Sequence, residues 1–222
     1  MAKKQSGIPL DRPRGRPPTA GAPGNRLIML GIDPGLSNTG YAVVEVDIGL
    51  KKFVRTLELG TIVTERDNHA QIRRTSDDLR RARVLHRGLL DVTKRYQISV
   101  AANEMVSTSK FVRPSLNFGI MLGVIASFDF FVIQMLPKEV KKAVAGKSDA
   151  KKEDVIRWAL EMTRNDNVHW PTSARQNRMD IGYRARHVTL AAEHQADALA
   201  VAYAALQTDQ LRDSLSLRDA IF

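Results

Sequence analysis

The 222-residue sequence contains no cysteine, which excludes disulfide bonds and thiolate metal sites and suits a reducing compartment. It begins without the apolar segment of a secretory signal, and its early prolines and Asp11 argue against an amphipathic transit peptide. Long apolar runs are also scarce. The longest, residues 119–136, is interrupted by Asp129 and Gln134, so we interpret it as a short helix followed by a strand rather than a membrane span. We therefore expect a cytoplasmic protein with no membrane segment.

Acidic residues are fewer than basic residues. The chain has 34 Lys and Arg against 24 Asp and Glu, a formal net charge of +10. A strongly basic chain favours a polyanionic partner, with nucleic acid first and an anionic membrane second. The charge is uneven, because residues 1–26 contain six basic residues and one acid and so carry half of the net charge.

Residues 1–26 form a basic segment rich in Pro and Gly, which predicts a disordered, DNA-binding tail. Its "PRGRP" stretch resembles the core of an AT-hook, which lies along the floor of an A·T-rich minor groove. The AT-hook-like part spans residues 12–18, and its expected DNA contacts are Arg12, Arg14, Gly15 and Arg16. A generic electrostatic tail is the alternative, and a targeting signal is the least favoured interpretation.

The apolar pattern of residues 27–210 predicts one α/β domain, with residues 211–222 as a C-terminal extension. Three strands open the domain, and we expect Phe53, Leu57 and Leu59 to share one face of the third. The predicted segments are strands 26–33, 39–46, 52–64, 98–106 and 130–136, and helices 69–96, 115–128, 137–146, 149–164 and 190–206. This order predicts a mixed five-stranded sheet with helices on both faces.

The predicted helix 69–96 has an apolar stripe that includes Ile72 and Leu79. In the last helix we expect a packing face of Ala196, Leu199, Ala200 and Tyr203. Helix 115–128 is apolar enough to be either a dimer face or an ordinary part of the core.

Three acidic residues stand in unusual contexts. Asp33 ends the first buried strand, Glu104 lies in an otherwise apolar strand, and Asp197 is flanked by alanines in the last helix. His194 lies three residues before Asp197, on the same helix face, and Glu193 is four residues before it. Taken singly, these residues suit turn caps or solvent-facing positions. Together, if the first and fourth strands are neighbours, they predict a cluster of hard ligands for Mg²⁺ or Mn²⁺.

Four segments carry a family resemblance: "GIDPGLSNTGYAVVE", "ANEMV", "PKEVKKAVAGKSDAKKEDV" and "EHQADALAVAYAAL". In this order and spacing they resemble the motifs of the RuvC family of Holliday junction resolvases. The resemblance runs from about residue 27 to 206 and implies an RNase H-like fold. It also implies a homodimeric, Mg²⁺-dependent endonuclease that cuts four-way or other branched DNA.

The resemblance implies metal-binding roles for Asp33, Glu104 and Asp197, which would hold two Mg²⁺ ions, with Mn²⁺ as a substitute. His194 would be the fourth catalytic residue, as a ligand or as the group that activates water, and Glu193 competes for that role. Hydrolysis would leave 5′-phosphate and 3′-hydroxyl ends.

The resemblance also implies phosphate contacts for Lys141 and Lys152, with Lys142, Lys147 and Lys151 nearby. A solvated helix face is the alternative for these lysines. Five lysines in residues 141–152 meet only one acid within that segment, so we do not expect ion pairing to be their main use.

The chain departs from the family pattern at two positions. Ser107 stands where the family has an aromatic residue that stacks at the junction centre, and Ser148 replaces a glycine. Phe111 is the candidate replacement for the aromatic, with core packing as its alternative. The added tail and the altered loop favour a bacteriophage source.

Three other functions remain open. "DPGLSNTG" also fits the phosphate-binding turn of actin-like ATPases and sugar kinases, although those proteins need two such domains. A resolvase-like nuclease with a different structured nucleic acid substrate is the second alternative. A non-catalytic, architectural DNA-binding protein is the third, and the retained acidic residues argue against it.

Overall fold

The computed structural model describes residues 26–69, 71–105, 111–171, 192–211 and 213. The predicted DNA contacts of the tail (Arg12, Arg14, Gly15 and Arg16), Ser107 and almost all of the predicted C-terminal extension lie outside these residues.

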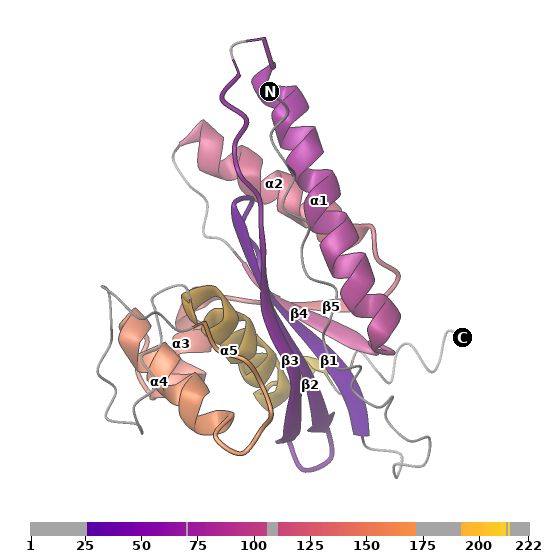
Figure 1. Cartoon of the computed structure of the whole chain (residues 1–222). Helices are drawn as coiled ribbons and strands as arrows, with labels where there is room; N and C mark the ends of the chain where they lie inside the picture. Colours follow the sequence, from indigo (N-terminus) through magenta and orange to yellow (C-terminus); the bar gives the residue numbers. More distant parts are fainter. Residues whose placement is uncertain (1–25, 70, 106–110, 172–191, 212, 214–222) are drawn as a thin grey trace.

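A mixed five-stranded sheet forms the centre of the domain, in the order β3-β2-β1-β4-β5 (Figure 1). β1 pairs antiparallel with β2, and β2 with β3, whereas β4 is parallel to both β1 and β5. The strands are β1 (Arg26–Asp33), β2 (Asn38–Asp47), β3 (Lys52–Val63), β4 (Val100–Glu104) and β5 (Phe131–Met135). The predicted mixed five-stranded sheet is confirmed, and the first and fourth strands are neighbours, which is the condition for the predicted acidic cluster.

Helices cover both faces of this sheet (Figure 1). The first face is covered by α1 (Arg74–Arg95) and α2 (Val112–Ala126), which enclose one apolar cluster with residues such as Leu30, Val43 and Ala101. The opposite face is covered by α3 (Pro137–Ala145), α4 (Lys152–Met162) and α5 (Glu193–Gln207). The predicted α/β architecture with helices on both faces is therefore confirmed.

The prediction that Phe53, Leu57 and Leu59 share one face of β3 is wrong for Leu57. Phe53 and Leu59 pack on the side of α5, whereas Leu57 packs on the side of α1 and α2. The cause is a pair of irregularities in the β2–β3 ladder, between Val43 and Val44 and between Glu45 and Val46. An extra residue in one strand reverses the alternation of side chains beyond it.

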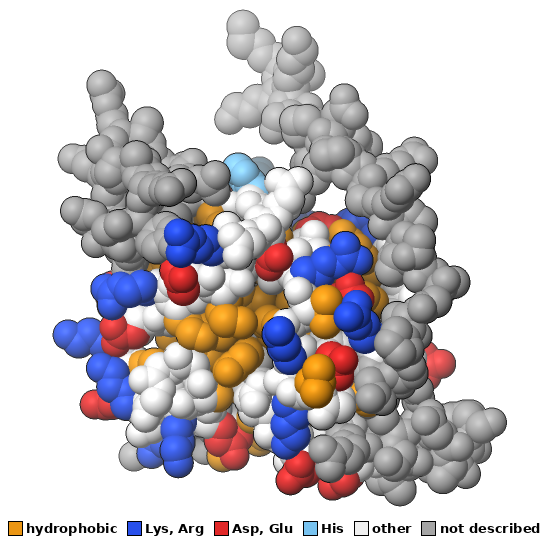
Figure 2. Space-filling model, turned by 90° about the horizontal axis from the view of Figure 1, so that it is seen from below, with side chains coloured by type: hydrophobic (Ala, Val, Ile, Leu, Met, Phe, Trp, Pro, Cys, Tyr) orange, Lys and Arg blue, Asp and Glu red, His pale blue; other side chains and the backbone are white. Residues whose placement is uncertain are grey.

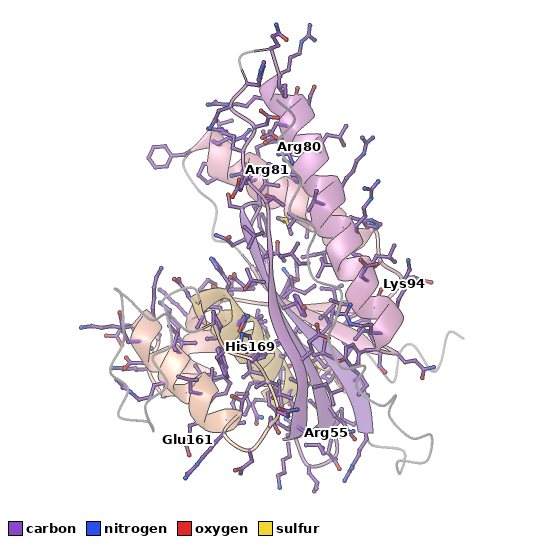
Figure 3. The ribbon with its side chains drawn as sticks, in the orientation of Figure 1. Arg55, Arg80, Arg81, Lys94, Glu161 and His169 are labelled. Atoms are coloured by element: carbon purple, nitrogen blue, oxygen red, sulfur yellow. The ribbon has the colours of Figure 1, made fainter. Side chains whose placement is uncertain are left out.

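The first half of α1 differs from its predicted apolar stripe. Ile72 precedes the helix and is 41% exposed, and Leu79 is 53% exposed. Charged residues are buried in their place, and Arg81 is only 5% exposed. Its guanidinium donates to the hydroxyls of Thr64 (2.9 Å) and Ser37 (2.7 Å), beside the end of β3 and the turn after β1 (Figure 3). Hydrogen bonding makes this burial tolerable, because an unpaired buried charge is costly.

α5 lies directly against the backbone of the sheet. A Cβ atom on Gly31 of β1 would come within 2.0 Å of the Ala198 carbonyl oxygen, and one on Gly40 of β2 within 1.9 Å of the His194 carbonyl oxygen. Only glycine permits so close an approach. The predicted packing residues Ala196, Leu199 and Ala200 are fully buried, and Tyr203 is partly exposed. α3 and α4 cover the other side of α5, which accounts for its burial on nearly every side.

Within the described ranges, no helix is both long enough and apolar enough to cross a membrane. Figure 2 shows the end of the molecule at the bottom of Figure 1. Hydrophobic side chains gather near its centre, and basic and acidic side chains are interspersed around them. Among the described residues on this face, the charges of the two signs are therefore mixed.

Candidate active site

The site begins where β1 and β4 end side by side. Ile32 of β1 is aligned with Asn103 of β4, so the next residues, Asp33 and Glu104, leave the sheet at the same edge. Pro34 follows Asp33 at the end of β1, and its missing N–H cannot extend the ladder. The turn is held by the Thr39 hydroxyl, which donates to the carbonyl oxygen of Gly35 at 2.7 Å. Two carboxylates are thereby brought together by adjacent parallel strands.

The first turns of α5 bring two more residues to this edge. The close approach of Gly40 to the His194 backbone fixes the start of the helix against β2. His194 Nδ1 lies 2.7 Å from Asp33 Oδ2. Asp197 lies one turn further along the same helix, close enough to Asp33 and Glu104 for their charges to act on its carboxylate. The structure thus brings all four predicted catalytic residues, Asp33, Glu104, His194 and Asp197, into one site.

Burial and repulsion from neighbouring carboxylates dominate the electrostatics of Glu104 and Asp197. Burial, followed by repulsion from Asp33, raises the pKa of Glu104 to about 7. Burial and repulsion from Asp33 and Glu104 raise the pKa of Asp197 to about 8. The pKa of His194 is also raised, mainly by its hydrogen bond to Asp33. The raised pKa values of Glu104 and Asp197 show that negative charge is unfavourable here, and a cation between the carboxylates would relieve it.

The donor chemistry of the site fits a hard divalent ion. Carboxylate oxygens with one imidazole are ligands that suit Mg²⁺ or Mn²⁺, and the raised pKa values indicate uncompensated negative charge. Among the residues that the structure describes, no three His, Asp or Glu side chains are yet arranged as a metal-binding group. The side chains would therefore have to adjust around an ion, and the site fits a metal in composition and charge.

The predicted phosphate-binding lysines lie at different places around the site. Lys141 of α3 is close enough to Glu104 that its positive charge lowers the pKa of Glu104, opposing the effects of burial and of Asp33. Lys152, the first residue of α4, forms an ion pair with Glu193 at 2.5 Å. Lys147 pairs with Asp154 at 3.5 Å. Lys142 is exposed on α3. Our reasoning that ion pairing would be minor is thus wrong for two lysines, because their acidic partners come from outside residues 141–152.

Glu193 and His194 were rival candidates for the fourth catalytic position. His194 contacts Asp33, whereas the Glu193 carboxylate is paired with Lys152. The arrangement favours His194 as the residue that serves the acidic cluster directly.

Phe111 is 74% exposed, so its core-packing alternative is wrong. It immediately precedes α2, and the adjacent Val112 is 86% exposed. Arg113 anchors this end of α2, since its guanidinium donates to both carboxylate oxygens of the buried Asp78 of α1. An exposed aromatic side chain is therefore presented by a firmly held helix start.

Sequence reasoning missed the residues that position the site. Gly31 and Gly40 let α5 reach the sheet, and Arg81 ties α1 to Ser37 in the turn after Asp33. The two glycines were visible within strands, where glycine often marks close backbone approach. Arg81 carried no such signal, because its partners are distant in sequence.

Comparisons with known proteins agree with this geometry. The sequence matches the family model described as "Crossover junction endodeoxyribonuclease RuvC" over residues 29–167. The protein of that name from Ehrlichia chaffeensis is 30% identical over 131 residues, covering 57% of this chain and 76% of that protein. The one from Neorickettsia sennetsu is 33% identical over 132 residues, covering 58% and 74% respectively.

Solved structures share the fold. The Thermus thermophilus RuvC structure has a TM-score of 0.57 and 24% identity, covering 85% of this chain and 97% of that chain. T. thermophilus RuvC in complex with Holliday junction substrate has a TM-score of 0.56 and 25% identity, covering 80% and 92%.

The fold and the acidic edge of its sheet define an α/β protein of the RNase H-like class. Within that class the matched residues are specific. The chain belongs to the RuvC family of crossover junction endodeoxyribonucleases. This membership decides against the ATPase and sugar kinase alternative and against a non-enzymatic protein.

Proposed function

We propose that this endodeoxyribonuclease resolves four-way DNA junctions by hydrolysis at the cluster of Asp33, Glu104, His194 and Asp197. The observation that carries the proposal is the convergence of three carboxylates and a histidine at the shared end of β1 and β4. The Holliday junction bound to T. thermophilus RuvC supports four-way DNA as the substrate.

Each residue of the cluster has a role that follows from its position. Asp33, Glu104 and Asp197 would hold Mg²⁺, two ions per site, with Mn²⁺ as a substitute. When bound, these ions would withdraw charge from the scissile phosphate and lower the pKa of the attacking water. His194 Nδ1 is engaged by Asp33, which leaves Nε2 to accept a proton from that water. Cleavage of the P–O3′ bond would normally leave a 3′-hydroxyl, and the family resemblance supports such ends here with a 5′-phosphate.

Basic side chains around the cluster would position the DNA backbone. Lys141 lies beside Glu104, and Lys152 lies at the start of α4 next to α5. Lys142 and Lys147 extend the basic surface along and beyond α3, although Lys147 is partly engaged by Asp154. Phe111 supplies the exposed aromatic surface that can stack on a base at the open centre of a junction.

A homodimer would provide the two cuts that resolution needs. α2 buries Met121, Val124 and Ile125 but leaves Leu116 and Leu122 exposed by 44% and 39%. Cβ atoms added to Gly119 and Gly123 of the same helix would meet nothing within 4 Å. This open, partly apolar surface is our candidate dimer face, and two-fold symmetry would place one site on each of two opposed strands.

The N-terminal tail would tether the enzyme to DNA in the cytoplasm. Its arginines and Gly15 suit an A·T-rich minor groove, and a tether raises the effective concentration of DNA at the domain. Deletion of residues 1–24 is expected to weaken binding to A·T-rich duplex more than to G·C-rich duplex. An equal loss on both would leave only a general electrostatic tail.

The central experiment compares three substrates. Purified protein with Mg²⁺ is given a synthetic four-way junction, a Y-fork and a linear duplex, beside the Asp33→Asn and Asp197→Asn variants. We expect the junction to be cut preferentially and both variants to be inactive although folded. Equal cutting of all three substrates would overturn junction selectivity, and full activity in either variant would overturn the assigned site.

A further inference from the structure

One ion pair joins the first residues of two helices at the edge of the site. Lys152 begins α4 and Glu193 begins α5, and Lys152 Nζ lies 2.5 Å from Glu193 Oε1. The two side chains differ in accessibility, since Lys152 is 65% exposed and Glu193 is 22% exposed. The ammonium group is therefore open to an incoming ligand, while the carboxylate is held against the protein.

This pair belongs electrostatically to the acidic cluster. The pKa of Lys152 is raised first by Glu193 and then, more weakly, by Asp197. Glu193 in turn adds to the effects that raise the pKa values of His194 and Asp197. Lys152 thus stands where a DNA phosphate that reaches the catalytic carboxylates would find a cation.

A carboxylate and a phosphate compete for the same ammonium group. Both bind it through negatively charged oxygens and hydrogen bonds from the amine. A phosphate at Lys152 would bring a second anion next to Glu193, and like charges at such a distance repel. The lysine cannot therefore serve both partners well at the same time.

We propose that Glu193 is the exchange partner of Lys152: its carboxylate occupies the lysine in the DNA-free protein and yields it to a phosphate of the junction. The inference rests on the proposed function, because it assigns a DNA phosphate to Lys152. Glu193 positions Lys152 at the edge of the cluster before DNA arrives, and it lowers the affinity of that lysine for the backbone.

The test measures junction affinity. Glu193→Gln removes the competing charge and keeps the size of the side chain. We expect it to tighten binding by about two- to fivefold, the range that corresponds to breaking an exposed ion pair. Binding of a fluorescent four-way junction is followed by anisotropy at fixed salt with a chelator, so that no cleavage occurs.

A matched control separates this pair from general charge effects. Glu153→Gln removes an equal charge from the neighbouring exposed position on α4 and leaves the ion pair intact. We expect it to change the affinity by less than about 1.5-fold, because Glu193 forms the ion pair with Lys152 and Glu153 acts on that lysine only as a weaker surface charge. Lys152→Gln provides a second background, in which the additional Glu193→Gln substitution is expected to have no further effect.

The outcomes are distinct. Unchanged or weaker binding by Glu193→Gln would overturn the proposal, and so would an equal gain in the Lys152→Gln background or in Glu153→Gln. Melting temperatures of all variants verify folding, and Glu193→Ala is expected to tighten binding in the same direction if the glutamine variant is unstable. If the unsubstituted enzyme instead fails to prefer a junction over linear duplex, the proposed function itself has failed.

Discussion

Replacement of Gly40 by alanine would test how α5 positions the active site. The new Cβ atom would lie 1.9 Å from the His194 carbonyl oxygen and 2.4 Å from its carbonyl carbon. Ordinary contact begins at 3.4 Å, so the helix start or the strand has to move by about 1.5 Å. The obstacle is backbone, which cannot rotate away as a side chain does.

The displacement should reduce activity more than stability. Misplacement of catalytic groups by about 1 Å can lower a rate about 10²-fold. Overpacking of this kind costs about 1–3 kcal/mol in the free energy of unfolding, and each kcal/mol lowers Tm by about 2–4 °C in a chain of this size. We therefore expect a folded variant whose single-turnover rate on a four-way junction falls about 10²-fold.

Gly60→Ala is the matched control. Its Cβ would meet the Tyr41 ring at 2.3 Å, a side chain on β2, and not the backbone of α5. We expect a comparable loss of stability with little loss of rate per folded molecule. The reasoning is refuted if Gly40→Ala cleaves within about threefold of the unsubstituted enzyme, or loses no more rate than Gly60→Ala.

Three further predictions concern stability and assembly. Arg81→Leu leaves the buried Thr64 hydroxyl without its donor and should lower the free energy of unfolding in urea by about 2–4 kcal/mol. Arg83→Leu, on the exposed side of α1, should lower it by under about 0.5 kcal/mol. Equal losses in the two variants would contradict a role for the buried hydrogen bonds. Because the pKa of Asp197 is raised from 3.8 to about 8 in the folded protein, ionisation destabilises the metal-free fold as pH rises from 4 to 8. Asp197→Asn should therefore gain on the unsubstituted protein by on the order of 2–5 kcal/mol at pH 8 and by almost nothing at pH 4, and an equal Tm difference at both pH values would argue against this assignment. If the proposed homodimer forms through α2, Leu122→Glu should convert it to monomer in sedimentation analysis, and an unchanged dimer mass would place the interface elsewhere.

The acidic site was predictable because its residues are marked by local sequence patterns, namely strand ends and helical spacing. Asp33 and Glu104 each end an apolar strand, and parallel neighbours end at the same edge of a sheet. His194 and Asp197 share a helix face through their spacing alone. The sequence therefore indicated the four-residue cluster on the condition that the first and fourth strands are neighbours, and the structure supplies that strand order.

The remaining features depend on contacts between distant residues. Arg81 bonds to Ser37, 44 positions away, and Arg113 bonds to Asp78, 35 positions away, so both resemble solvated charges in the sequence. The displacement of Leu57 to the other face arises from an irregular ladder, which no alternation of residue types reveals. The ion pair of Glu193 with Lys152 likewise depends on the tertiary contact between the starts of α4 and α5, which the sequence does not reveal.

The burial of α5 has a consequence for motion. Amide protons in the middle of a helix enclosed by a sheet and by α3 and α4 exchange with solvent only when the surrounding core opens, at a free energy near that of global unfolding. Asp197 lies in this enclosed helix, and His194 lies one turn before it at the start of α5, so both are carried by a backbone that the core holds in place. Adjustment around an ion and fitting of the substrate must then come from side chain rotations and from the mobility of the DNA, while the backbone of α5 stays in place.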